Sequence, residues 1–210
     1  MFAITADQID SRHRPDHAED ALAILAHTAA GRLLLPADRT AGDEVQALTQ
    51  DPRTALEIVL ALARTGLWSV GLGIGGVRTP LPSATRAVTG DALVAAREAV
   101  EAAKRRQWRA AVVGAGTRPS AGTLQAMLEL LLQLRERRSP EGWELYDLVE
   151  AGLTQAQAAE RLGITPQAAS KRAIAAAVRL DAAAREGIVE LLTAADGADA
   201  GAAPRTEEDA

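Results

Sequence analysis

The sequence predicts an α+β domain over residues 1–115, followed by an all-helical domain over residues 118–193. In the first part, short apolar runs alternate with segments of helical periodicity, a pattern typical of strands joined by helices. These strand-like runs stop before residue 115, and from Ser120 onwards the apolar residues recur at helical spacing. Alanine and leucine are abundant and aromatic residues make up only 2% of the chain, which favours helices.

The first domain is predicted to follow the order β-α-β-β-α-β, and then α and β. The predicted strands are residues 2–6, 32–35, 45–49, 67–77 and 110–113, and the predicted helices are residues 17–30, 51–64 and 90–106. This order is typical of a ferredoxin-like sheet domain, in which two split β-α-β units interlock. Glycines at positions 71, 73, 75 and 76 lack the Lys-Ser/Thr ending of a phosphate loop, and they predict either close approach of another backbone or a β-bulge.

The second domain is predicted to begin with an amphipathic helix over residues 120–137. Its leucine-rich face has two interpretations, a dimer seam or the core of the domain itself. A helix over residues 140–151 follows, with Trp143 and Tyr146 expected in the core, and another helix covers residues 179–194. Residues 195–210 form an acidic, Gly- and Ala-rich tail that we expect to be disordered.

Residues 154–172 predict a helix-turn-helix. Thr154 is a suitable cap for a first helix, Gly163 breaks that helix, and Ile164 fills the turn. Thr165 is a suitable cap for a second helix, with Pro166 at the first-turn position where a missing N–H costs nothing. A short helix, a glycine turn and a second helix rich in basic and amide side chains are what reading of the DNA major groove requires. The alternative interpretation is an ordinary helical hairpin within a bundle.

The second helix supplies the candidate DNA contacts. We expect base contacts from Thr165, Gln167, Ser170 and Lys171, with Gln167 suited to adenine and Lys171 to guanine. The other two candidate DNA contacts, Arg172 and Arg179, are expected to bind phosphate. The net charge of −5 does not oppose this prediction, because the tail from Thr193 holds five acidic residues and one arginine.

A group of carboxylates is predicted at one end of the sheet. Asp7 closes the first strand, and Asp43 and Glu44 lie at the turn before the third strand. First and third strands are neighbours in a β-α-β-β sheet, so these carboxylates are expected to meet. Carboxylates on adjacent strand ends suit Mg²⁺ or Mn²⁺, with nucleotide phosphates completing the coordination. Turn chemistry alone is the other interpretation.

These motifs resemble the palm domains of class III nucleotide cyclases and GGDEF proteins, and more narrowly the SatD family. The resemblance covers about residues 2–115. Its motifs are Ile4-x-x-Asp7 with Ser11-Arg12, Gly42-Asp43-Glu44, the glycines at 71, 73 and 75, and Gly90-x-Ala92 with Ala96-Arg97. It implies metal ligation by Asp7, Asp43 and Glu44, and nucleotide contacts from Arg12 and Arg97.

The cyclase pattern is incomplete in one place. Val94 occupies the position of the cyclase asparagine, and Arg97 arrives one residue early. No catalytic residue is therefore assigned, and a nucleotide-sensing or dimerising domain is expected rather than an enzyme. The predicted function is a DNA-binding transcriptional regulator. The alternative is a metal-dependent nucleotidyl-transfer or cyclase-type enzyme with a localising DNA-binding module.

Partners and location follow from composition. The predicted partners are double-stranded DNA, a nucleotide with Mg²⁺ or Mn²⁺, and a second copy of the chain, since a single recognition helix buries little surface and a dimer reads two half-sites. The chain has no cysteine and no long apolar run, so neither disulfides nor a membrane partner is expected. We expect it in the cytoplasm, associated with the nucleoid when bound to DNA.

Overall fold

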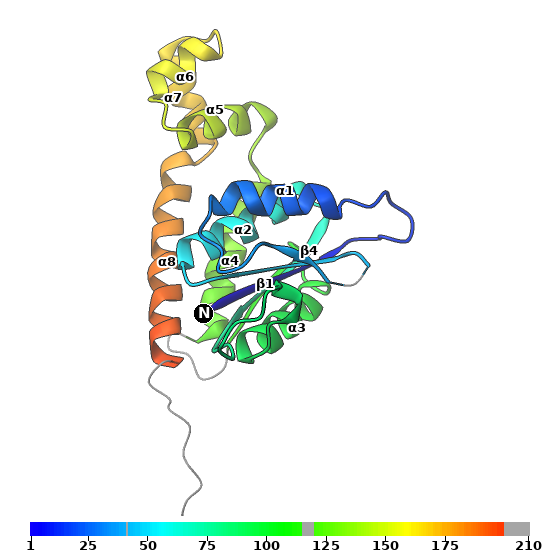
Figure 1. Cartoon of the computed structure of the whole chain (residues 1–210). Helices are drawn as coiled ribbons and strands as arrows, with labels where there is room; N and C mark the ends of the chain where they lie inside the picture. The colour runs from blue at the N-terminus through cyan, green and yellow to red at the C-terminus, as the bar shows by residue number, and fades with distance from the viewer. Residues whose placement is uncertain (41, 115–119, 200–210) are drawn as a thin grey trace, which may run out of the picture. The chain divides into compact units, whose positions relative to one another are not determined.

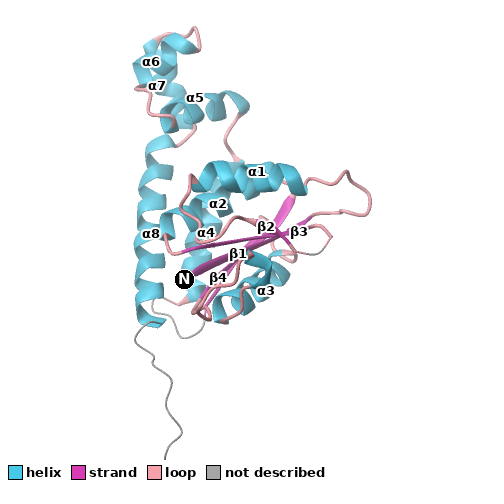
Figure 2. Cartoon of the chain, viewed as in Figure 1, coloured by secondary structure: helices cyan, strands magenta, loops and turns pink. Residues whose placement is uncertain are grey.

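The computed structural model describes residues 1–40, 42–114 and 120–199, and it forms two compact units (Figures 1 and 2). The sheet unit holds Met1–Leu128 and the chain from Ile188 on, and the helical unit is Glu129–Gly187. The division falls inside helices α4 (Ala121–Glu136) and α8 (Val178–Asp199). The sequence suggested a boundary near residues 115–120, of which 115–119 lie outside the described residues.

The sheet unit is built on a five-stranded mixed sheet. Its strands are β1 (Phe2–Gln8), β2 (Asp38–Arg39), β3 (Glu44–Thr49), β4 (Trp68–Ile74) and β5 (Ala110–Gly114), in the order β2-β3-β1-β4-β5. β1 runs antiparallel to both β3 and β4, whereas β5 runs parallel to β4. This arrangement confirms the α+β class and the expected adjacency of the first strand and the strand after the turn.

The predicted strand at residues 32–35 is wrong. Leu33 forms only an isolated bridge to Thr49, and the short edge strand β2 lies further on. The backbone N–H of Leu34 donates to the carbonyl of Leu48 at 2.9 Å, but the pairing does not continue as a strand, and the side chains of Leu34 and Leu35 pack against the buried cluster around Ala3 and Leu48.

Helices cover both faces of the sheet. Figure 2 shows α1 (Ala18–Ala29) and α2 (Pro52–Thr65) on one face and α3 (Asp91–Ala103) on the other. Asp51 caps α2 by accepting hydrogen bonds from the backbone N–H groups of Arg53 and Thr54. A short 3₁₀ helix, η1 (Thr85–Ala87), lies in the connection from β4 to α3.

The glycines of β4 allow α3 to lie directly on the strand, as the sequence predicted. A Cβ atom on Gly73 would overlap the backbone of Ala92 and Ala96, and one on Gly71 would overlap the backbone of Val100. The facing residues of α3 are small and fully buried, among them Ala92 and Ala96. This contact fixes the position of α3 over the sheet.

The outer edge of β5 is closed by a side chain. The buried Gln125 of α4 accepts a hydrogen bond from the backbone N–H of Val112 at 2.8 Å and donates one to the carbonyl of Ala110 at 3.3 Å. Its amide therefore replaces a further strand at an edge that would otherwise expose unpaired backbone groups.

The helical unit contains α5 (Pro140–Glu150), α6 (Gln155–Arg161) and α7 (Pro166–Ala175), together with the adjoining parts of α4 and α8. Its core consists of Leu145 and Tyr146 together with small residues such as Ala158 and Ala169, and Trp143 packs against it. The leucines of α4 at 124, 128, 131 and 132 are buried within the single chain, which supports the core interpretation of that face.

The tail departs from expectation where the structure describes it. Residues 195–199 continue α8, and Ala195 is fully buried, because the alanine-rich segment extends the helix. The remaining part of the predicted tail, residues 200–210, lies outside the described residues. Among the described helices, none has the length and apolar character needed to cross a membrane.

Candidate functional site

The turn between α6 and α7 has well-defined hydrogen bonding. Gly163 adopts a φ of +65°, its N–H donates to the carbonyl of Glu160 at 3.1 Å, and the N–H of Ile164 donates to that of Ala159 at 3.0 Å. These two bonds form a Schellman motif, which ends α6 sharply. The hydroxyl of Thr165 then accepts from the N–H of Ala168 at 3.1 Å and starts α7. The predicted helix boundaries on both sides of this turn are therefore confirmed.

α7 has one buried face and one open face. Ala169 and Ala173 are buried in the core of the helical unit. On the other side, Gln167, Ser170 and Lys171 are exposed, and their side chains have no partner within the described part of the chain. An amide, a hydroxyl and an ammonium group thus lie together on a helix whose other side is held by packing.

The two predicted phosphate contacts differ from each other. Arg172 is half-buried, and its Nη1 lies 3.7 Å from Oε2 of Glu144 on α5. Arg179, near the start of α8, is exposed and has no partner among the described residues. Its charge is available to a ligand, whereas that of Arg172 is partly compensated.

A buried charge cluster, which sequence reasoning missed, joins the helices of this unit. Asp181 of α8 is fully buried and accepts hydrogen bonds from Nε and Nη2 of Arg135 at 2.7 and 2.8 Å. It also accepts from Arg138 at 3.0 Å and from the hydroxyl of Tyr146 at 3.2 Å. The only signal in the sequence is a pair of arginines three residues apart, at and just beyond the end of the leucine-rich helix.

Aromatic rings enclose the arginines of this cluster. The guanidinium carbon of Arg138 lies 4.3 Å from the ring centroid of Trp143 and 4.1 Å from that of Tyr146. Burial raises the pKa of Asp181, but hydrogen bonds and charges from Arg135 and Arg138 outweigh it, so the pKa lies below its usual value. Burial raises the pKa of Tyr146 to about 12, which keeps its hydroxyl protonated as a donor.

The carboxylates predicted in the sheet unit lie at neighbouring positions. Asp7 of β1 is directly opposite Glu44 of β3, and the N–H of Gln8 donates to the carbonyl of Asp43 at 3.2 Å. Asp7 and Asp43 line a hollow of about 660 Å³ together with Arg12, Lys104 and Arg109. The expected adjacency of the strand ends that carry Asp7, Asp43 and Glu44 is therefore present, although Glu44 does not line this hollow.

Two of the three predicted carboxylates, those of Asp7 and Glu44, are already paired with other groups. Nζ of Lys104 lies 3.2 Å from Oδ2 of Asp7. Burial lowers the pKa of Lys104, but hydrogen bonds to Glu101 and Asp7 outweigh it and raise the pKa, so the ammonium stays charged. Glu44 accepts from the hydroxyl of Thr40 at 2.6 Å.

These pairings do not fit a directly ligated metal ion, because the ammonium group of Lys104 is paired with Asp7, one of the carboxylates that the metal would require. Within residues 1–40, 42–114 and 120–199, no group of three or more His, Cys, Asp or Glu side chains is arranged to hold a metal ion. Metal ligation by Asp7, Asp43 and Glu44 stays a prediction from the resemblance.

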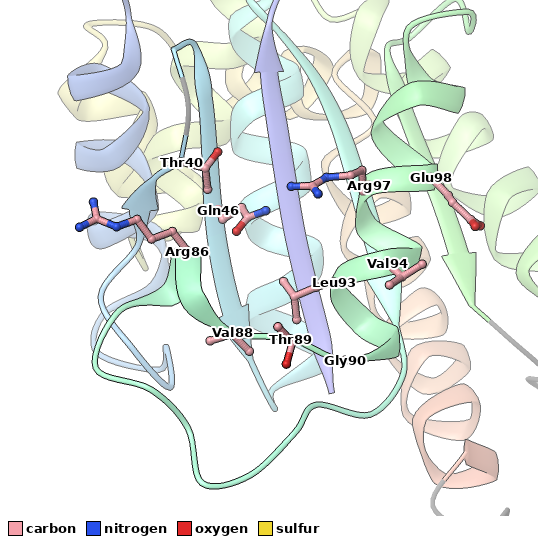
Figure 3. A pocket seen from close by; sticks show the side chains of 10 residues that line it. All are labelled: Thr40, Gln46, Arg86, Val88, Thr89, Gly90, Leu93, Val94, Arg97 and Glu98. Carbon is pink, nitrogen blue, oxygen red and sulfur yellow. The ribbon is translucent and has the colours of Figure 1, made fainter.

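Arg97 lies over a different hollow from Arg12. This second hollow, of about 440 Å³, lies beside α3 and is floored by Gln46 of β3. In Figure 3 the guanidinium of Arg97 extends from α3 across β1 towards Gln46, whereas Arg86 and Glu98 point away from the hollow. The structure therefore separates the two arginines that the sequence assigned to one nucleotide site.

Comparison of the chain with protein families, curated proteins and solved structures found no match.

Proposed function

We propose that this protein binds double-stranded DNA through α7 and acts as a transcriptional regulator. The observation that carries the proposal is the open face of Gln167, Ser170 and Lys171, on a helix that follows a glycine turn and is packed on its other side. Exposed polar groups without protein partners, on a helix held by its apolar face, suit direct reading of base edges in the major groove.

Each side chain has a role that its chemistry suggests. Gln167 would pair with adenine and Lys171 with guanine, while Ser170 and Thr165 accept or donate single hydrogen bonds. The hydroxyl of Thr165 is shared with the helix cap. Arg179 would contact phosphate directly, and Arg172 would do so only after leaving Glu144.

A selected DNA duplex provides the test. Purified full-length protein is used to enrich binding sites from a randomised duplex library, and Kd is then measured on the enriched sequence by fluorescence anisotropy. We expect Lys171→Ala to raise Kd about ten-fold or more, because a side chain that reads a base contributes about 1–3 kcal/mol.

The matched control is Arg14→Ala, which removes one positive charge from an exposed arginine of the sheet unit. A loss of affinity that reflects the net charge of the protein alone would be similar in both variants. Absence of enrichment, or equal loss of affinity in Lys171→Ala and Arg14→Ala, would contradict the proposal.

For the sheet unit we propose a ferredoxin-like, palm-type domain that binds a nucleotide at the hollow around Arg12. The strand order β2-β3-β1-β4 supports the fold assignment. The basic side chains of Arg12, Lys104 and Arg109 around one hollow support binding of phosphates. The paired state of Asp7 favours sensing over metal-dependent turnover.

Thermal denaturation with ATP, GTP and their cyclic forms tests this second part. A ligand that binds the folded state raises Tm. We expect a rise with at least one nucleotide, which Arg12→Gln should abolish. If no nucleotide changes Tm, the sensor proposal fails, while the DNA-binding proposal is judged by its own titration.

Dimerisation belongs to the same proposal, because two recognition helices are needed to read two half-sites. Sedimentation of the protein with and without the enriched duplex measures it. A complex of two chains per duplex is expected, and one chain per duplex would contradict it.

A further inference from the structure

We propose that the hollow between α3 and β3 is a binding site for a small amphipathic monocarboxylate, separate from the nucleotide site around Arg12. The hollow measures about 440 Å³, within the range of ligand pockets. Its floor is polar, one wall is apolar, and the guanidinium group of Arg97 lies at its rim.

The floor of the hollow is the amide of Gln46, whose oxygen has no protein partner among the described residues. Gln46 is only 5% exposed, and its neighbours on the same sheet face include the fully buried residues Leu48 and Thr5. Its Nε2 donates weakly to Thr5 and Glu44, at 3.5 and 3.4 Å. Its Oε1 accepts no hydrogen bond from the described residues. Among the described residues, the buried side-chain atoms that lack a hydrogen-bond partner are Nη1 of Arg138 and Nε of Arg185, so Oε1 of Gln46 is open to the hollow, and a ligand that donates a hydrogen bond would replace water there.

The rim carries the charge that would select an anion. The guanidinium of Arg97 extends over the hollow towards Gln46 (Figure 3). Its one partner among the described residues is Glu44, with Nη2 and Oε1 3.9 Å apart, beyond hydrogen-bond distance. Glu44 itself is engaged by the hydroxyl of Thr40. The N–H groups of Arg97 are therefore available for a carboxylate, which accepts them in a bidentate manner.

The wall of the hollow is apolar and is held in place. Val88, Leu93 and Val94 line it, and Val94 is 61% exposed. The segment that carries Val88 is attached to the strand β2 region, because the hydroxyl of Thr85 donates to the carbonyl of Pro36 at 2.7 Å. An apolar ligand body would cover this wall and remove it from water.

The charge at this hollow distinguishes its ligand from a nucleotide. Two basic side chains are among the described residues that line it: Arg97 extends over the hollow, whereas Arg86 points away and lies 3.6 Å from Asp38. A triphosphate requires several cationic partners, whereas one guanidinium matches one carboxylate. The ligand class is therefore a monocarboxylate with an apolar body and a hydroxyl or amide that donates to Gln46.

Ligand-observed NMR titration of the full-length protein tests the site. The probes are 3-hydroxybenzoate and 4-hydroxyphenylacetate, each compared with its neutral amide. We expect the acids to bind more tightly than the amides, and Arg97→Gln to raise Kd about ten-fold. Gln46→Leu should weaken the hydroxylated acids more than benzoate, which lacks the donor.

Arg78→Gln is the matched control, because Arg78 is exposed in the same connection but does not line the hollow. It should leave Kd unchanged. Failure of both acids to bind, equal binding of acid and amide, or an unchanged Kd in Arg97→Gln would overturn the proposal. Displacement of the acids by ATP would show a shared nucleotide site and would overturn it as well.

Discussion

Asp181 in the helical unit and Gln46 in the sheet unit are both almost completely buried polar residues, but they differ in how they are satisfied. Asp181 accepts hydrogen bonds from Arg135, Arg138 and Tyr146. Gln46 makes two long contacts through its nitrogen, and its oxygen faces a hollow without a donor. Asp181 is surrounded by side chains of its own unit, whereas Gln46 is accessible to a small molecule.

This difference distinguishes a buried polar residue that stabilises the fold from one that can bind a ligand. A satisfied and enclosed charge holds helices together, and removing it leaves its partners unpaired. A polar group whose acceptor lies open to a hollow is hydrated in the free protein and can pair with a ligand when one binds. Substitution of Asp181 should therefore cost much more stability than substitution of Gln46.

The largest effect is expected for Asp181→Asn. The substitution leaves the guanidinium groups of Arg135 and Arg138 buried without a compensating charge, which should cost about 3–5 kcal/mol of the free energy of unfolding. Urea denaturation followed by far-UV circular dichroism measures the loss.

The matched control is Glu160→Gln on the exposed side of α6, where Glu160 has no side-chain partner among the described residues. It should change stability by less than about 0.5 kcal/mol. A similar, small change in both variants would show that the Asp181 cluster does not hold the unit together.

Lowering the pH should also reduce the free energy of unfolding, because protonation of Asp181 removes the same negative charge as Asp181→Asn. The pKa of Asp181 lies below its usual value because its arginine contacts outweigh the effect of burial, so the folded state favours the carboxylate. Its contribution is therefore complete above the unfolded pKa of about 3.9 and is lost as pH falls below that value through the folded pKa.

We expect the stability of the wild type to fall more steeply below about pH 4 than that of Asp181→Asn. Asp51 also has a lowered pKa, because hydrogen bonds from Thr54 and Arg53 outweigh burial, but its contribution is common to both proteins. Denaturation at a series of pH values gives the comparison, and parallel pH profiles would contradict it.

The next effect concerns the position of α3, which carries Arg97 over the hollow. Gly73→Ala would place a Cβ atom against the backbone of Ala92 and Ala96, and overpacking of this kind costs about 1–3 kcal/mol. Gly76→Ala is the control, since nothing lies within 4 Å of its added Cβ. Equal urea midpoints for the two variants would show that α3 does not depend on this close contact.

Much of this architecture was predictable because it depends on local patterns. The strand and helix order, the Schellman turn at Gly163 and the close approach at Gly73 each follow from residue types and spacing. The pairing of β1 with β3 placed Asp7 opposite Glu44, as expected. The open face of α7 likewise follows from helical periodicity, with Ala169 on the opposite side.

The remaining features arise from contacts between residues distant in the sequence. Lys104 reaches Asp7 only because α3 ends beside β1, and this pairing changes the character of the predicted metal site. Gln46 alternates with Val45 and Ala47, so strand periodicity would place it towards solvent. α3 and its preceding connection cover that face of the sheet, and the polar residue becomes the floor of a hollow.

The smallest effect is expected for Gln46→Leu. Leucine has a similar volume, the lost donor contacts to Thr5 and Glu44 are long and weak, and the lost Oε1 has no protein partner among the described residues. We expect the free energy of unfolding to change by less than about 1 kcal/mol, since no well-formed hydrogen bond is removed. Urea denaturation beside Asp181→Asn provides the measurement. A loss of more than about 1 kcal/mol would mean that Gln46 supports the fold as Asp181 does. The comparison between an enclosed polar residue and an accessible one would then fail, because both would be structural.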